Sequence, residues 1–235
     1  MTETTHQVPE TRPAVRPGWP EIVVGLAVMS LVGYGIPILL FRPLGIEGAV
    51  SGVLLALLSG TAGMIGFAAA AAIRIRELGP FGVRKTSGKW LLLGLAGGLV
   101  ALLVKIIVMP ALVSAFGLAT DTQDTYAAGA SAGPLFVILM MLSLAVITPI
   151  GEELLFRGVL TTALLRYGPW IGVIGSSVIF ALMHGINFVL PAAVIVGLIA
   201  GELRRRSGSI WPGVIVHAVN NSITVVVYAL IGLSG

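Results

Sequence analysis

Cysteine is absent from the chain, and charged residues are scarce. Without cysteine the protein forms no disulfide, holds no metal through thiolates and has no cysteine nucleophile. Lys, Arg, Asp and Glu make up only 10% of the 235 residues, whereas hydrophobic residues make up 57%. The mean hydropathy of +1.03 is far above that of a soluble domain. The composition therefore predicts an integral membrane protein.

Several protease motifs are also missing. The chain has no H-E-x-x-H sequence, which the zincin type of metalloprotease requires. Its only aspartates, Asp121 and Asp124, lie in one predicted loop, so an intramembrane aspartyl dyad is excluded. The sequence GASAG at 129–133 fits G-x-S-x-G, but it lies in a small-residue loop and not at the strand-to-helix turn that a nucleophilic serine needs. We interpret it as a chance match.

Long hydrophobic segments recur from residue 21 almost to the C-terminus, and a helix needs about 20 mostly apolar residues to cross a bilayer. Seven segments are predicted to span the membrane: 21–41, 48–73, 90–117, 135–165, 170–187, 190–203 and 210–233. We therefore expect an all-α fold, a polytopic transmembrane helical bundle with N-terminal helices over 21–134 and a second group over 135–233. Residues 1–20 are polar and rich in proline, and we expect them to form a disordered cytoplasmic tail.

The basic residues gather in two loops. The loop between the second and third segments and the loop between the sixth and seventh contain Arg74, Arg76, Arg84, Lys85, Lys89, Arg204, Arg205 and Arg206. Loops rich in Lys and Arg face the cytoplasm, which predicts a cytoplasmic N-terminus. Because these clusters explain the net charge of +4, we expect no nucleic-acid partner.

Ionisable side chains inside membrane segments are costly, so each one suggests a functional site. Glu153 and Arg157 lie four residues apart on one helix face and are predicted to form a structural ion pair. Glu152 lies about 100° around the same helix, which leaves it free to act as a general base. Lys105, in the third segment, either pairs with a buried carboxylate or lines a cavity.

Two further segments present polar side chains at helical spacing. Phe180 and His184 lie four residues apart, as do His217 and Asn221, and the second pair could donate hydrogen bonds to an oxyanion. Each residue alone could merely link helices, but the set fits water activation combined with oxyanion stabilisation. A zinc site built from Glu152, His184 and His217 also stays open, because two histidines and a glutamate form a known catalytic set.

These motifs resemble those of the CAAX protease and bacteriocin-processing (CPBP) family of membrane endopeptidases, which includes the type II CAAX prenyl endopeptidases. The resemblance rests on E-E-x-x-x-R at 152–157, F-x-x-x-H at 180–184 and H-x-x-x-N at 217–221, in that order. It covers residues 146–225 and implies that the segment 135–233 is a catalytic transmembrane core.

The resemblance implies a role for each motif residue. Glu152 and His184 would activate a water for attack on a peptide carbonyl, and His217 and Asn221 would stabilise the oxyanion. The remaining motif residues would support them structurally. Family members have been described both as metalloproteases and as glutamic endopeptidases. We favour the second mechanism, with no cofactor, because no residue set in the chain demands zinc.

The resemblance also implies partners and a location. We expect the substrate to be a membrane-tethered peptide or protein, with a prenylated CAAX-like tail as one candidate, and the enzyme to lie in the lipid bilayer of a bacterial or archaeal cell. From the predicted topology we expect the active-site cavity to open to the cytoplasm or to the inner leaflet. The alternatives are a non-catalytic bacteriocin-immunity or membrane binding protein and a proton-coupled transporter.

Overall fold

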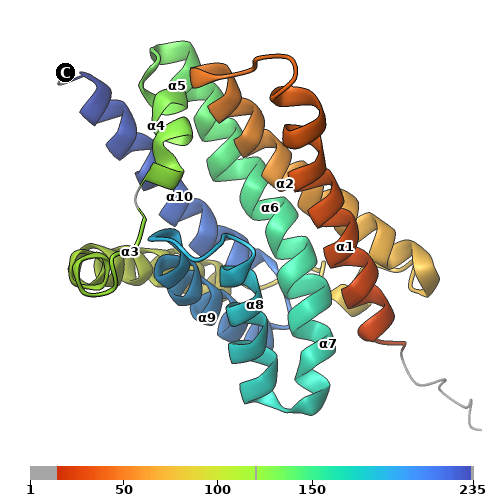
Figure 1. Cartoon of the computed structure of the whole chain (residues 1–235). Helices are drawn as coiled ribbons and strands as arrows, with labels where there is room; N and C mark the ends of the chain where they lie inside the picture. Colours follow the sequence, from red (N-terminus) through yellow and green to blue (C-terminus); the bar gives the residue numbers. More distant parts are fainter. Residues whose placement is uncertain (1–14, 120, 234–235) are drawn as a thin grey trace, which may run out of the picture.

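The computed structural model describes residues 15–119 and 121–233, and all regular structure in these ranges is helical (Figure 1). The prediction of an all-α fold is therefore confirmed. Most of the predicted tail, residues 1–14, lies outside the described residues. The first helix begins at Trp19, two residues before the first predicted span.

The N-terminal part is a pair of helices joined at its base by a salt bridge. Helix α1 (Trp19–Ile36) continues through the wider turn η1 (Pro37–Phe41), and α2 (Gly48–Arg74) runs back beside it. Arg74 Nε lies 2.6 Å from Glu21 Oε1, and the side chain of Glu21 is fully buried. This salt bridge connects the start of α1 to the end of α2.

One long helical run over 134–167 forms the centre of the molecule (Figure 1). Its main parts are α5 (Pro134–Met140), η4 (Met141–Ile147), α6 (Thr148–Glu153), η5 (Leu154–Thr161) and α7 (Thr162–Leu164). In η4 and η5 the turns are π-helical, so each backbone N–H bonds to the carbonyl five residues earlier. Such wide turns often mark functional sites, and η5 begins directly after Glu153.

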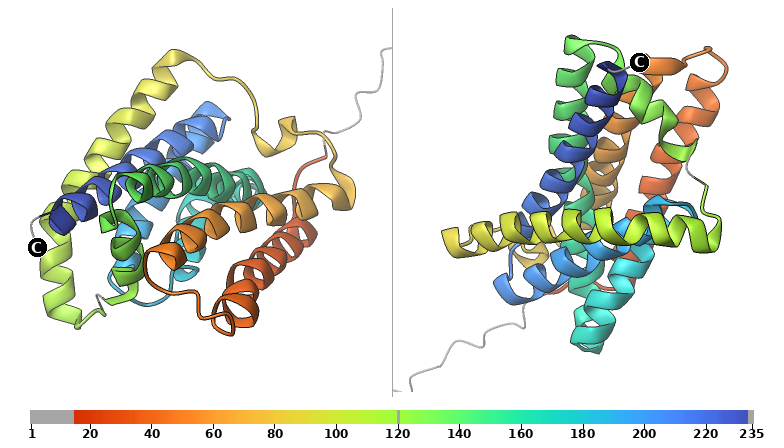
Figure 2. Two further views of the ribbon diagram at one scale, coloured as in Figure 1. Left: turned by 90° about the horizontal axis from the view of Figure 1, so that it is seen from above. Right: turned by 90° about the vertical axis from the view of Figure 1, so that its left-hand side faces the viewer.

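Five further helices complete the bundle: α3 (Gly88–Phe116), α4 (Asp124–Ser131), α8 (Ser176–Leu182), α9 (Val189–Ser207) and α10 (Trp211–Leu233). Helix α3 lies across the others at a steep angle, as the right-hand view of Figure 2 shows. It packs against α9 and α10, which also pack against each other. Small residues allow these close contacts, since a methyl group at Gly94 would lie 2.6 Å from the carbonyl oxygen of Pro212.

Five of the described helical runs are long and apolar enough to cross a membrane: Trp19–Phe41, Gly48–Arg74, Gly88–Phe116, Pro134–Tyr167 and Trp211–Ile231. They support an integral membrane protein. The other two predicted spans are helical but do not meet this criterion. Residues Ile171–Leu182 form a shorter apolar helix, and α9 carries Glu202 and three arginines in its last turns. The predicted count of seven spans is thus not confirmed.

The two basic loops lie together at one end of the bundle. Ile210 N donates to Gly82 O over 3.0 Å, and Arg84 Nε donates to Gly208 O over 2.9 Å. Gly82 and Gly208 have left-handed backbones, with φ of 76° and 69°, which allow both sharp turns. Because α1 starts beside this basic end, Arg42 lies at the other end, after η1.

Helices α2 and α6 touch backbone to backbone. A methyl group at Gly63 would lie 2.6 Å from the carbonyl group of Gly151, and one at Gly60 would lie 2.5 Å from that of Ile147. The hydroxyl of Thr148 donates to Ala56 O over 2.8 Å. This contact places the middle of α2 directly beside the two glutamates of α6.

Candidate active site

Three parts of the fold bring the carboxylate of Glu152 together with both histidines. Glu152 lies on α6, His184 in the turn after α8, and His217 on α10. Glu152 Oε2 lies 3.9 Å from His184 Nε2 and 3.8 Å from His217 Nε2. Only 2% of the glutamate side chain is exposed. The sequence motifs, which are separated by up to 65 residues, therefore meet at one carboxylate oxygen.

The other oxygen of Glu152 is held by a residue that the sequence did not indicate. Ser59 Oγ, from α2, donates to Glu152 Oε1 over 2.6 Å. Glu152 Oε2 has no direct hydrogen-bond partner among the described residues, so it is the oxygen that is left for chemistry. A serine in an apolar segment carries no specific signal, and only the contact between α2 and α6 reveals its role.

Backbone contacts fix the ring of His184. Its Nδ1 lies 2.9 Å from the carbonyl oxygen of Phe180, which can only accept, so Nδ1 carries the hydrogen. In the neutral ring the lone pair is then on Nε2, which faces Glu152. Asn187 Nδ2 donates to His184 O over 2.7 Å and secures the turn. Asn187 is a second site residue that the sequence did not indicate.

Glu153 and Arg157 form the predicted ion pair. Glu153 Oε2 lies 3.1 Å from Arg157 Nε, and both side chains are fully buried. The guanidinium carbon of Arg157 lies 4.8 Å from the centroid of the Phe180 ring. That ring also makes edge contacts with Phe156 and His184, at centroid distances of 4.9 and 4.8 Å. Phe180 thus packs against both the ion pair and the histidine.

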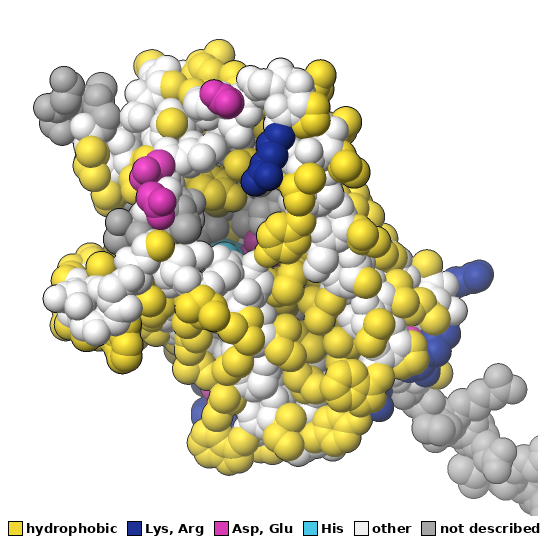
Figure 3. Space-filling model, viewed as in Figure 1, with side chains coloured by type: hydrophobic (Ala, Val, Ile, Leu, Met, Phe, Trp, Pro, Cys, Tyr) yellow, Lys and Arg dark blue, Asp and Glu magenta, His cyan; other side chains and the backbone are white. Residues whose placement is uncertain are grey.

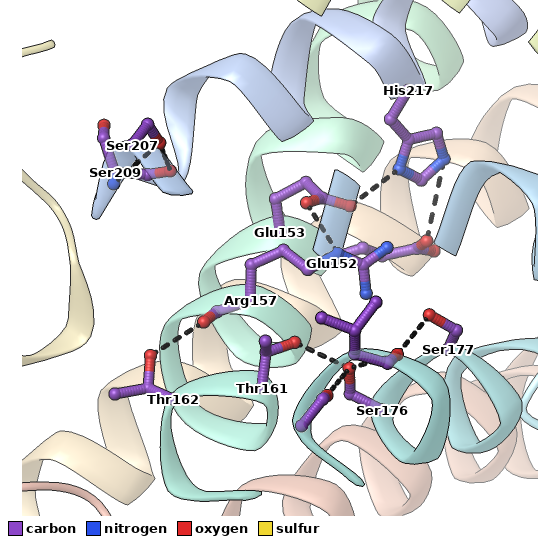
Figure 4. Close-up of polar contacts among 12 residues, drawn as sticks. Glu152, Glu153, Arg157, Thr161, Thr162, Ser176, Ser177, Ser207, Ser209 and His217 are labelled. Carbon is purple, nitrogen blue, oxygen red and sulfur yellow. Dashed lines mark hydrogen bonds and ion pairs between the residues drawn. The ribbon is translucent and has the colours of Figure 1, made fainter. Parts of the chain in front are cut away.

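His217 lies between the two glutamates, as Figure 4 shows. Its Nδ1 is 3.6 Å from Glu153 Oε1, while its Nε2 faces Glu152, and only 5% of the side chain is exposed. Sequence reasoning assigned Glu153 to Arg157 alone. The structure adds a contact from Glu153 to His217, which connects the ion pair to the residue beside Glu152.

Asn221 is held by the long central helix. Its Nδ2 donates to Leu144 O over 2.9 Å, and its Oδ1 accepts from Asn220 Nδ2 over 3.1 Å. An amide group has two hydrogens, so one remains for another acceptor. Asn221, Asn220 and His217 all line the same cavity. The structure therefore brings the predicted oxyanion donors to one place, and their role stays a prediction.

Two cavities meet at Glu152. The first has a volume of about 440 Å³ and is lined by polar groups that include Lys105, His217 and Asn221. The second, of about 390 Å³, reaches Arg42. Both are lined by Ser59, Gln123, Tyr126, Glu152, His184 and Val189. Figure 3 shows the hollowed face, with a histidine side chain visible inside it.

Both cavities extend away from the basic end. No residue of the loops at 75–87 and 205–210 lines either cavity, whereas Arg42 and Gln123 from the other end do. The buried rings of Phe67 and Phe81, which line neither cavity, pack edge to face against each other in the core, and Phe81 lies in the basic loop at 75–87. The cavities thus lie away from the basic loops, the end for which the sequence predicts the cytoplasm, and the expectation that they open to the cytoplasm or inner leaflet stays a prediction.

The residues that could hold a metal are Glu152, His184 and His217. In the ranges 15–119 and 121–233, no group of three or more His, Asp or Glu side chains is arranged to hold a metal ion. Zinc ligands lie about 2.0–2.2 Å from the ion. Glu152, His184 and His217 are thus not arranged as a metal site in this structure, and both the metal-free mechanism and the zinc alternative stay predictions.

One protein family matches the part of the chain that contains Glu152, His184 and His217. Residues 134–223 match the family described as type II CAAX prenyl endopeptidase Rce1-like. A protein of Escherichia coli, described as an uncharacterized 24.3 kDa protein, is 33% identical over 87 residues. The match covers 34% of this chain and 40% of that relative's length. No solved structure matches the chain.

Proposed function

We propose that the protein is an intramembrane endopeptidase that hydrolyses peptide bonds with a water activated by Glu152 and His184, because residues 134–223 match the family described as type II CAAX prenyl endopeptidase Rce1-like. One observation carries this proposal. Glu152 Oε2 is buried, has no direct hydrogen bond among the described residues and faces two histidines where two cavities meet.

The spacing at Glu152 suits a bound water. Separations of 3.8 and 3.9 Å are too long for direct hydrogen bonds between the carboxylate and the imidazoles. A water can contact both groups across such a gap. Glu152 Oε2 accepts one proton from this water, and the water oxygen attacks the carbonyl carbon of the peptide. His184, fixed through Nδ1, positions the water with Nε2.

The remaining steps follow from the groups around the attacked carbon. Attack turns the carbonyl oxygen into an oxyanion, which accepts hydrogen bonds from Asn221 Nδ2 and from a protonated His217 Nε2. When the C–N bond breaks, Glu152 returns its proton to the leaving amine. The products are one new carboxylic acid and one new amine, and the carboxylate is regenerated. The ion pair of Glu153 and Arg157 holds the helix and orients His217.

The substrate follows from the cavities and the family. The first cavity is formed largely by the side chains of membrane helices, including Leu102, Ile106 and Met109. It suits a peptide with apolar side chains or a lipid-modified tail. We propose a membrane-associated peptide, with a prenylated CAAX-like tail as one candidate, in agreement with the family's description.

The test is cleavage by the purified full-length protein in lipid vesicles that carry a library of membrane-tethered peptides. We expect Glu152→Gln to lower the rate by about 10²- to 10⁴-fold, the usual contribution of a general base. Glu202→Gln is the matched control, because Glu202 forms only surface ion pairs with Arg205 and Arg206. For the metal-free mechanism, a strong chelator should leave the wild-type rate unchanged.

Three results would contradict the proposal. Undiminished cleavage by folded Glu152→Gln would remove Glu152 from the chemistry. Complete loss of activity with the chelator would require a metal. If the wild-type protein cleaves nothing but carries protons across the vesicle membrane in a Glu152-dependent way, the protein is a transporter instead.

A further inference from the structure

Lys105 lies in helix α3, which is long and apolar enough to cross a membrane, and it lines the first cavity. Its Nζ donates to Thr224 Oγ1 over 3.2 Å, and no ion pair joins it to an acidic residue in the described ranges. An ammonium group has three hydrogens to donate. A charge in the middle of an apolar helix is costly without an anionic partner, so this cation calls for one.

The carboxylate of Glu152 is not the anionic partner of Lys105. Among the residues that the structure describes, Glu152 is the only acidic one that lines the first cavity. Its Oε1 accepts from Ser59, and its Oε2 faces the two histidines. In the first cavity, the carboxylate of Glu152 is thus engaged by its own neighbours, and the ammonium group of Lys105 is available to bind another anion.

We propose that Lys105 binds the free C-terminal carboxylate of the substrate and is therefore a specificity-determining residue. This inference rests on the proposed peptidase function. The C-terminal carboxylate is the one anionic group that every unmodified peptide chain carries. In an apolar cavity, a hydrogen bond between an ammonium and a carboxylate is stronger than one between neutral groups.

Helix α10 gives the distance between the cation and the reacting centre. His217, Asn221 and Thr224 recur at helical spacing and line the first cavity. With a rise of about 1.5 Å per residue, Thr224 lies roughly 10 Å along the axis from His217. An extended peptide covers about 3.3–3.6 Å per residue. A carboxylate held beside Thr224 therefore places a bond about three residues from the chain end next to His217.

The other cation at this end of the molecule serves as a control. Arg42 lines the second cavity, but its side chain is exposed at the end of η1, where water or lipid headgroups can solvate it. It therefore has less need of a ligand than Lys105. If the chain end entered the second cavity instead, Arg42 would be the residue that selects it.

The test compares one membrane-tethered peptide in three forms: with a free C-terminal carboxylate, as the C-terminal amide, and as the amide with an aspartate at the last position. We expect the wild-type enzyme to cleave the free acid roughly 10- to 100-fold faster than the plain amide. Lys105→Met should reduce cleavage of the acid to the rate of the amide. Lys105→Arg should keep most of the preference, and Arg42→Met should keep all of it.

Several results would overturn the assignment. Equal cleavage of acid and amide by the wild type would do so, as would loss of the preference in Arg42→Met and not in Lys105→Met. Cleavage of the aspartyl amide as fast as the free acid would show that any carboxylate is accepted.

The thermal midpoint of Lys105→Met in detergent should match that of the wild type, because the methionine leaves no buried charge.

A binding measurement separates this inference from the proposed function. In the Glu152→Gln variant, a fluorescently labelled peptide with a free C-terminal carboxylate should bind more tightly than the same peptide as its C-terminal amide. Adding Lys105→Met should abolish this difference in affinity. If no form is cleaved but this preference is present, the peptidase function fails while the carboxylate site stands. If peptides are cleaved but no preference is found, the peptidase stands and the carboxylate site fails.

Discussion

Two adjacent glutamates with the same chemistry have different surroundings. Glu152 faces the cavities and two histidines, whereas Glu153 points toward Arg157 and Gly213. A side chain at position 213 would occupy the place of the Glu153 carboxylate, so α10 can approach only because this residue is glycine. These neighbours support the proposed division of roles, with Glu152 in the chemistry and Glu153 in structural support.

At the residue level we predict that substitution of Glu153 lowers the stability of the protein and that substitution of Glu152 does not. Glu153→Gln removes the charge that pairs with the fully buried Arg157, and an unpaired buried cation costs about 3–5 kcal/mol of stability. Glu152→Gln should leave the thermal midpoint close to that of the wild type. Thermal unfolding of the purified proteins in detergent measures both.

A double variant tests whether the lost stability comes from the stranded charge. Glu153→Gln combined with Arg157→Met should recover much of the loss, because neither charge is then buried alone. If Glu153→Gln unfolds at the wild-type temperature, the ion pair contributes little and our assignment of Glu153 is wrong.

Spacing along a single helix was enough to predict several residue contacts. Glu153 with Arg157, and Phe180 with His184, lie four apart and do meet, because helical geometry alone determines such pairs. The contacts of Ser59 could not be predicted in this way. They depend on how α2 crosses α6, a relation between residues 93 positions apart that no local pattern contains.

At the level of elements, the close crossing of α2 and α6 positions Ser59 beside Glu152. We predict that Gly63→Ala separates these helices, since its methyl group would lie 2.6 Å from the Gly151 carbonyl. Overpacking of this kind costs about 1–3 kcal/mol. It should also slow peptide cleavage, because Ser59 moves with α2. Thermal unfolding and the peptide assay measure the two effects.

Gly35→Ala is the matched control for this crossing. Gly35 also lies in a helix that is long and apolar enough to cross a membrane, but nothing lies within 4 Å of the position that its methyl group would take. We expect wild-type activity and unchanged or slightly raised stability, since alanine favours a helix more than glycine does. Equal losses in both variants would contradict a specific role for the crossing.

The boundaries of the elements show what hydropathy can and cannot predict. The predicted segments 48–73 and 90–117 agree closely with α2 and α3, because long apolar runs have no other stable conformation in lipid. The wide turns η4 and η5 and the short helix α4 were not predicted. They are set by packing around the site, which leaves no periodic signal.

At the level of the whole molecule, the basic loops lie at one end and the two cavities extend toward the other. The loops around Arg84 and Arg204 form the basic end, while the cavities extend toward Arg42 and Gln123. If the basic end faces the cytoplasm, as its charge predicts, peptides reach Glu152 from the opposite side or from within the bilayer.

The absence of cysteine makes this orientation simple to measure. Lys85→Cys lies in a basic loop and Glu47→Cys lies before α2 at the other end, and each gives the chain a single thiol. In intact cells, a membrane-impermeant maleimide should label Glu47→Cys at once and Lys85→Cys only after permeabilisation. The reverse pattern would place the basic end outside and the cavity on the cytoplasmic side.

The hydrogen bond from Ser59 to Glu152 has a wider consequence. Ser59, Arg42 and Lys105 all precede residue 134, so they lie outside the segment that matches the peptidase family. In the proposed reaction, the C-terminal segment provides the reacting groups, and the N-terminal helices provide much of the wall against which a substrate would lie. Proteins that share only the segment 134–223 can therefore share a reaction and still differ in the tails they accept.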